Sequence, residues 1–158
     1  MRHGLLTLVI GVLVTLTSAV GCKSYEGGAV EIAWVIRGSD QHAYDCDSAA
    51  LGDRRISKIR LIIMGASGAY EGQDICLSGQ VSDCVFDCDS SFGSSTHRGI
   101  TSFTIPSGDW YIGIVPLDRD GNALLASEAQ TPEPILQNIQ TGDLTFLGVW
   151  QIVVNIQE

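Results

Sequence analysis

The stretch Trp150-Gln151-Ile152-Val153-Val154-Asn155-Ile156-Gln157 decides the fold class, because large apolar residues recur in it at every second position. Successive side chains of a β-strand point to opposite faces, so this alternation predicts a strand with one buried face. The same alternation occurs in Val30–Ile36 and Ile56–Met64. The segment Asp109–Leu117 is apolar at both sets of positions and is expected to be a central strand.

Shorter strands complete the predicted fold. They are expected at Ile75–Leu77, Val81–Asp87, Ile100–Ile105 and Ala123–Ala126, with turn residues between them. Helical periodicity does not persist over several turns beyond the N-terminal segment. About seven short strands therefore predict an all-β fold, an antiparallel β-sandwich. The three tryptophans are expected to fill its core rather than to form a platform for carbohydrate.

Three polar stretches carry residues with catalytic or metal-binding chemistry. His42 and His97 lie in segments expected to be solvated loops. Because catalytic triads assemble in space rather than in sequence, a Ser-His-Asp site that uses His97 is the alternative interpretation. The stretch Asp118–Asn122 has calcium-loop residue types, but its glycine comes too early and the required glutamate is missing. It is therefore predicted to be a turn.

The N-terminus has the charge and hydropathy of a secretory signal peptide. Arg2 and His3 precede an apolar run that extends from Leu5 to Val20. A membrane-spanning helix usually needs about 20 apolar residues, which disfavours the alternative of an uncleaved anchor. The run ends at Ala19-Val20-Gly21-Cys22, where small residues directly precede a cysteine. This arrangement resembles the lipobox of bacterial lipoproteins.

The resemblance implies that residues 1–21 are a lipoprotein signal peptide and that Cys22 becomes the first residue of the mature chain. Its thiol would carry a diacylglyceryl group and its amine a fatty acyl group such as palmitate, and two or more acyl chains hold a protein stably on a bilayer. Residues 22–28 would form a lipidated tether, which spans about 20–25 Å when fully extended. Residues 29–158 would form the β-sandwich domain. Lys23, rather than an aspartate, implies an outer-membrane destination in the cell envelope.

Four further cysteines, Cys46, Cys76, Cys84 and Cys88, make an even set in a chain that is expected to be exported. Exported domains commonly use disulfides, so two disulfide bonds are expected. Four cysteines allow three pairings, and their spacing does not select one. The competing interpretation is a zinc site, but the chain lacks a C-x-x-C pair and offers few histidines as partners.

A second resemblance bears on the fold and the pairing. The stretch Pro106–Leu124, with Leu117-Asp118 before Gly121, looks like a hairpin of transthyretin-like and immunoglobulin-like bacterial modules. Val85–Cys88 resembles the F-x-C segment of uncharacterised lipoproteins with such a sandwich, where it pairs with an early cysteine. The resemblance implies an immunoglobulin-like or transthyretin-like domain and favours Cys46–Cys88 with Cys76–Cys84. It brings no catalytic residues to transfer, and none is assigned.

Aspartates flank both cysteines of the favoured long-range pair, in the triplets Asp45-Cys46-Asp47 and Asp87-Cys88-Asp89. If both segments were extended, the four carboxylates would point away from the disulfide and gather on one face. Calcium, which prefers several oxygen ligands, would suit such a cluster. A hydrated acidic rim without metal is the preferred interpretation, so no cofactor is assigned.

The formal net charge of −9 argues against nucleic-acid binding, because an acidic surface repels phosphate backbones. Together these observations favour a membrane-anchored envelope lipoprotein that acts as a non-enzymatic binding or structural module. Its expected partners are the bilayer, through acylated Cys22, and an envelope protein or glycan. An envelope hydrolase or a calcium-dependent adhesion module is the alternative.

Overall fold

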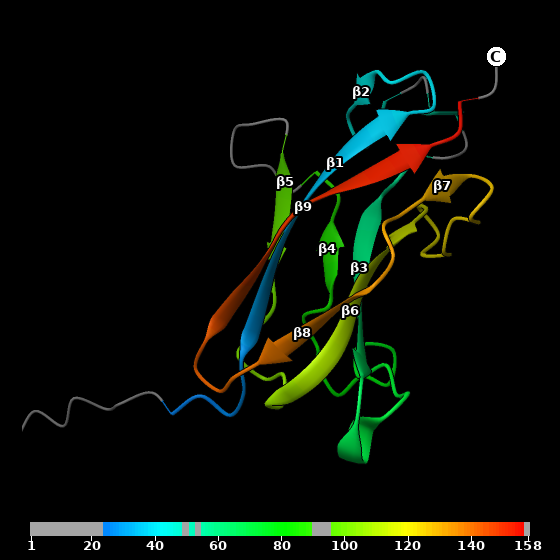
Figure 1. Cartoon of the computed structure of the whole chain (residues 1–158). Helices are drawn as coiled ribbons and strands as arrows, with labels where there is room; N and C mark the ends of the chain where they lie inside the picture. The colour runs from blue at the N-terminus through cyan, green and yellow to red at the C-terminus, as the bar shows by residue number, and fades with distance from the viewer. Residues whose placement is uncertain (1–23, 49–50, 53–54, 90–95, 157–158) are drawn as a thin grey trace, which may run out of the picture.

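The computed structural model describes residues 24–48, 51–52, 55–89 and 96–156 as an all-β fold with two sheets (Figure 1). The described ranges also include short 3-10 turns, at residues 51–52 and in η2 (Gly68–Tyr70). The first sheet contains β1 (Ala29–Gly38), β2 (Ala43–Tyr44), β5 (His97–Ile100), β7 (Ala129–Gln130) and β9 (Leu144–Val154). The second contains β3 (Lys58–Gly65), β4 (Val85–Asp87), β6 (Gly108–Leu117) and β8 (Ile135–Ile139). This architecture confirms the prediction of a β-sandwich.

The sheets have the strand orders β2-β1-β9-β7, with β5 also beside β1, and β4-β3-β6-β8. All neighbouring strands are antiparallel except β1 and β9, which run parallel. The sheets are thus mainly antiparallel, as predicted, and β1–β9 is the parallel pair among the described strands. The two strands are joined through the rest of the domain rather than by a hairpin, so no tight connection forces them to be antiparallel.

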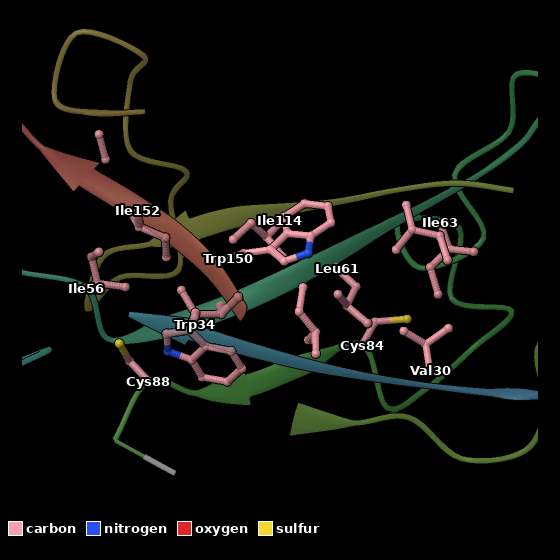
Figure 2. Close-up of a cluster of buried hydrophobic side chains, with 14 of the residues drawn as sticks. Val30, Trp34, Ile56, Leu61, Ile63, Cys84, Cys88, Ile114, Trp150 and Ile152 are labelled. Carbon is pink, nitrogen blue, oxygen red and sulfur yellow. The ribbon is translucent and has the colours of Figure 1, made fainter. Parts of the chain in front are cut away.

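The core lies between the sheets and is built from the apolar positions that alternate along each strand. In β3, Ile59, Leu61 and Ile63 are fully buried, whereas Lys58 and Met64 are exposed. Strands β1 and β9 contribute Trp34 and Trp150, which are register partners, and Figure 2 shows both indoles between the ribbons. The tryptophans are therefore core residues, as their spacing predicts.

Some strand boundaries differ from the sequence prediction. Strand β5 begins at His97, inside the stretch expected to be a loop, and ends at Ile100. The partner strand expected at Ala123–Ala126 is reduced to a single bridge between Leu117 and Ala123. The segment Ile75–Leu77 is a turn, since Asp74 Oδ1 accepts hydrogen bonds from the backbone N–H groups of two residues that follow it.

The chain enters the first sheet along a fixed path. Gly28 bridges to Ile105, and the N–H of Ala29 donates to the carbonyl of Asp143 at 2.9 Å. The segment that precedes β1 is therefore held at one end of the sandwich. In the described ranges, which begin at residue 24, no helix has the length and hydropathy to cross a membrane.

Candidate functional site

The sandwich has two distinct ends, which we call the tether end and the loop end. Strand β1 starts at the tether end and runs for ten residues, about 33 Å, to the loop end. Strand β3 starts at the loop end and β6 finishes there, and their terminal residues Lys58 and Leu117 are register partners. Figure 1 shows residues 24–28, which precede β1, at the lower left and β2 at the opposite end.

The disulfide Cys46–Cys88 fixes the main segment of the loop end. Its Cα atoms are 5.8 Å apart, and both cysteines are about 1% exposed. The N–H of Ile56 donates to the carbonyl of Cys46 at 3.2 Å, and the buried Ile56 side chain lies in the core near Cys88 (Figure 2). The bond thereby ties the segment that precedes β3 to the residue that follows β4.

The second disulfide, Cys76–Cys84, closes a shorter segment between β3 and β4, with a Cα–Cα distance of 5.6 Å. The structure thus contains the two pairs that the lipoprotein resemblance favours. Two disulfides indicate an oxidising, non-cytoplasmic environment. On the chain-entropy model the Cys46–Cys88 loop contributes about 4 kcal/mol and the Cys76–Cys84 loop about 2.5 kcal/mol.

Two adjoining cavities open at the loop end, and we call them together the arginine hollow. The larger has a volume of about 520 Å³, and the smaller about 90 Å³. Arg55 and Arg119 line both cavities. Gly52, Asp118 and Asp120 complete the described lining of the larger one, and Asp47, Ile56, Ser57 and Asp89 that of the smaller.

Strand pairing brings the two arginines together. The N–H of Ser57 donates to the carbonyl of Leu117 at 2.8 Å, directly before the Lys58–Leu117 register pair. Arg55 lies shortly before β3 begins, and Arg119 shortly after β6 ends. Neither residue belongs to a motif. They become neighbours through the register of β3 on β6, which no local sequence pattern encodes, so sequence reasoning missed both.

Neither guanidinium makes an ion pair with a described carboxylate. The Nε atom of Arg55 is buried and lacks a hydrogen-bond partner. A guanidinium stays charged at all physiological pH values, and leaving a buried charged donor unpaired costs more than about 1–3 kcal/mol. The cavities give an acceptor, from water or from a ligand, access to the parts of the Arg55 and Arg119 side chains that line them.

Asp118, although it lines the larger cavity, is occupied by its own turn. Its Oδ1 accepts hydrogen bonds from the N–H groups of Asp120 and Asn122, both at 2.8 Å, and Oδ2 accepts one from the Asn122 side chain. These bonds, chiefly the one from the Asn122 backbone, lower the pKa of the Asp118 carboxyl. Gly121, with φ +83°, supplies the left-handed residue that this turn needs. The turn predicted at Asp118–Asn122 is confirmed.

The aspartates that flank Cys46 and Cys88 do not gather as expected. All four, Asp45, Asp47, Asp87 and Asp89, are exposed, and the described residues contain no group of three or more that could hold a metal ion. Both cysteines lie in turns rather than in extended backbone, so their neighbours do not share one face. Only Asp47 and Asp89 come to the same cavity, the smaller one.

His42 and His97 have different environments. His42 is solvated, as expected, and its Nδ1 lies 3.0 Å from Asp40 Oδ2. His97 is only 6% exposed, so the expectation that it lies in a solvated loop was wrong. Its ring stacks on Trp34 with the centroids 6.3 Å apart, because β5 pairs with β1 and turns His97 toward the core.

Cys22, the expected site of lipid attachment, lies outside the described residues. Comparison of the chain with protein-family models, with curated proteins and with solved structures gives no match in any of the three.

Proposed function

We propose that this protein is an envelope lipoprotein, anchored through acylated Cys22, and that it acts as a non-enzymatic binding module. The proposed binding site is the arginine hollow. The observation that carries the proposal is that two arginines line both cavities and that neither makes an ion pair with a carboxylate among the described residues. Loops at one end of a β-sandwich are a common place for binding sites.

The chemistry of the hollow supports a ligand that carries carboxylate or phosphate groups. Arginine presents a fork of donors that matches such groups in a bidentate manner. The exposed carboxylates Asp47, Asp89 and Asp120 provide acceptors around the two arginines for hydroxyl or ammonium groups of the same ligand. An acidic envelope glycan or a peptide with free charged groups has this combination of groups.

The position of the hollow supports presentation from an anchored chain. It lies at the loop end, about one strand length of β1 from the tether end. A protein attached through residues 22–28 would thus keep the hollow clear of its attachment point. The disulfide Cys46–Cys88 holds the lining in place before ligand arrives, which reduces the entropy lost on binding.

Replacement of both arginines, in the variant Arg55→Gln/Arg119→Gln, is expected to weaken binding to isolated cell-envelope material by about tenfold or more. Each lost hydrogen bond to a charged group is worth about 1.5–3 kcal/mol. The control Arg37→Gln/Lys58→Gln changes the net charge equally at exposed positions of the loop end, outside the described lining. Bound protein is quantified against its concentration. Equal affinity of the two double variants would contradict the proposed site.

The anchor is tested by mass spectrometry of the protein extracted from membranes. We expect the mature chain to begin at Cys22 and to carry diacylglyceryl and acyl groups. In the variant Cys22→Ser, we expect residues 1–21 to remain attached and the acyl mass to be absent, because the serine cannot accept the thioether-linked lipid. An unprocessed leader on the wild-type chain would overturn the lipoprotein assignment.

A further inference from the structure

The outer face of the first sheet is apolar in the half that adjoins the tether end. Phe146 and Val149 of β9 are 61% and 57% exposed, and Leu144 and Ile100 are nearly half exposed. Tyr25 in the tether stacks on Phe103 with the ring centroids 4.4 Å apart. We call this surface the apolar face, and it consists of Tyr25, Ile100, Phe103, Leu144, Phe146 and Val149.

Strand register shows that the sheet residues of this surface share one side. Glu31 of β1 lies directly between Ile100 on β5 and Phe146 on β9. Two residues further along β1, Ala33 is the register partner of Val149, after a register shift between the two strands. At the other end of the face, Leu144 is the partner of Ala29, where the tether joins the sheet. The apolar face is therefore continuous with the tether.

The charged residues within this surface neutralise each other. Glu31 and Arg98 form an ion pair with an N–O distance of 3.0 Å across β1 and β5. Aromatic and aliphatic side chains surround the pair, as the register of Glu31 shows. Exposed apolar patches of this kind mark sites of protein or membrane contact, and the position of this one beside the tether selects the membrane.

We infer that the apolar face rests on the bilayer surface, with its side chains at the boundary between head groups and acyl chains. The inference depends on the proposed lipid anchor, because a tether of residues 22–28 confines Ala29 within about 20–25 Å of the membrane. At that distance the bilayer is always within reach, so a weak apolar contact becomes effective without a further loss of translational entropy. Aromatic rings favour this interfacial region.

The opposite outer face of the sandwich provides an internal control. Met64, Tyr111 and Leu136 form a row across β3, β6 and β8 and are also exposed. This row lies on the second sheet, whereas the tether leads into the first. A bilayer that contacts the apolar face cannot reach Leu136 at the same time, because the thickness of the sandwich separates them.

Single added tryptophans in the full-length, lipidated protein test the inference. The native tryptophans, Trp34, Trp110 and Trp150, are at most 5% exposed and give a constant background. Phe146→Trp and Leu136→Trp each place one new indole at a position more than half exposed, on opposite faces. Both variants are reconstituted into phosphatidylcholine vesicles whose acyl chains carry bromine near the head groups. A zwitterionic lipid is chosen because the formal net charge of −9 repels anionic membranes.

We expect bromine to quench the added indole of Phe146→Trp several-fold more strongly than that of Leu136→Trp. Equal quenching in both variants, or none in either while the protein floats with the vesicles, would overturn the inference and leave the anchor intact. Failure of the protein to float with the vesicles would overturn the anchor and, with it, this inference. Near-ultraviolet circular dichroism identifies any variant that has lost the native packing, and Val149→Trp then replaces Phe146→Trp.

Discussion

Trp34→Ala is expected to lower the free energy of unfolding by about 3–5 kcal/mol, the usual loss when a large buried aromatic side chain is truncated. Trp34 is fully buried, and its indole stacks with the rings of His97 and Phe86, each at a centroid distance of 6.3 Å. Its Nε1 atom has no hydrogen-bond partner among the described residues, so the loss arises from packing and from the cavity left behind.

The surroundings of Trp34 make that cavity hard to close. Phe86 is held against Gly99, where an added Cβ would collide with the phenyl ring, so this ring has little room to move. The measurement is equilibrium unfolding in guanidinium chloride with both disulfides intact. Tyr111→Ala, at a 44% exposed position on the outer face of the second sheet, is the control and should cost about 1 kcal/mol or less. Similar losses in both variants would contradict the central role of Trp34.

The variant Cys46→Ala/Cys88→Ala is expected to lose about 4 kcal/mol, the second large effect. The bond spans 42 residues, so its removal restores much conformational freedom to the unfolded chain. It also releases the segment that carries Arg55, and we therefore expect weaker binding at the arginine hollow in addition to lower stability.

The second disulfide is the matched control for the first. Cys76→Ala/Cys84→Ala opens a loop with a sequence separation of only 8, remote from the arginine hollow. This variant should lose about 2.5 kcal/mol and keep its affinity for envelope material. Unfolding midpoints and binding curves of the two double variants distinguish these effects. The reverse order of stability, or equal losses of binding, would contradict the assignment of Cys46–Cys88 as the bond that holds the site.

Long strands with one buried face were predictable because burial imposes a period of two on their residues. Strand β3 was found within two residues of its bounds for this reason, and β6 was found because it is apolar at both sets of positions. Strand β8 was missed, since Ile135–Ile139 lies at a sheet edge with a mixed polar composition and follows Pro134. His97 was misplaced because its polar neighbours indicate a loop, whereas pairing of β5 with β1 buries it.

The candidate site was harder to predict than the fold. Arg55 and Arg119 become neighbours only through the β3–β6 register, which no local pattern encodes. The aspartate triplets, by contrast, were conspicuous in sequence, but their expected convergence required extended backbone around Cys46 and Cys88. Turns at both cysteines remove that geometry.

The parallel pairing of β1 with β9 has a mechanical consequence. Strand β1 begins at the tether end, and strand β9 finishes at the opposite end, where Val154 is the register partner of Gly38. A force that pulls Ala29 and Val154 apart therefore loads the ladder between them in shear, so its hydrogen bonds must break together rather than one at a time. Such a domain would resist being stretched between a fixed surface and anything that grips its far end.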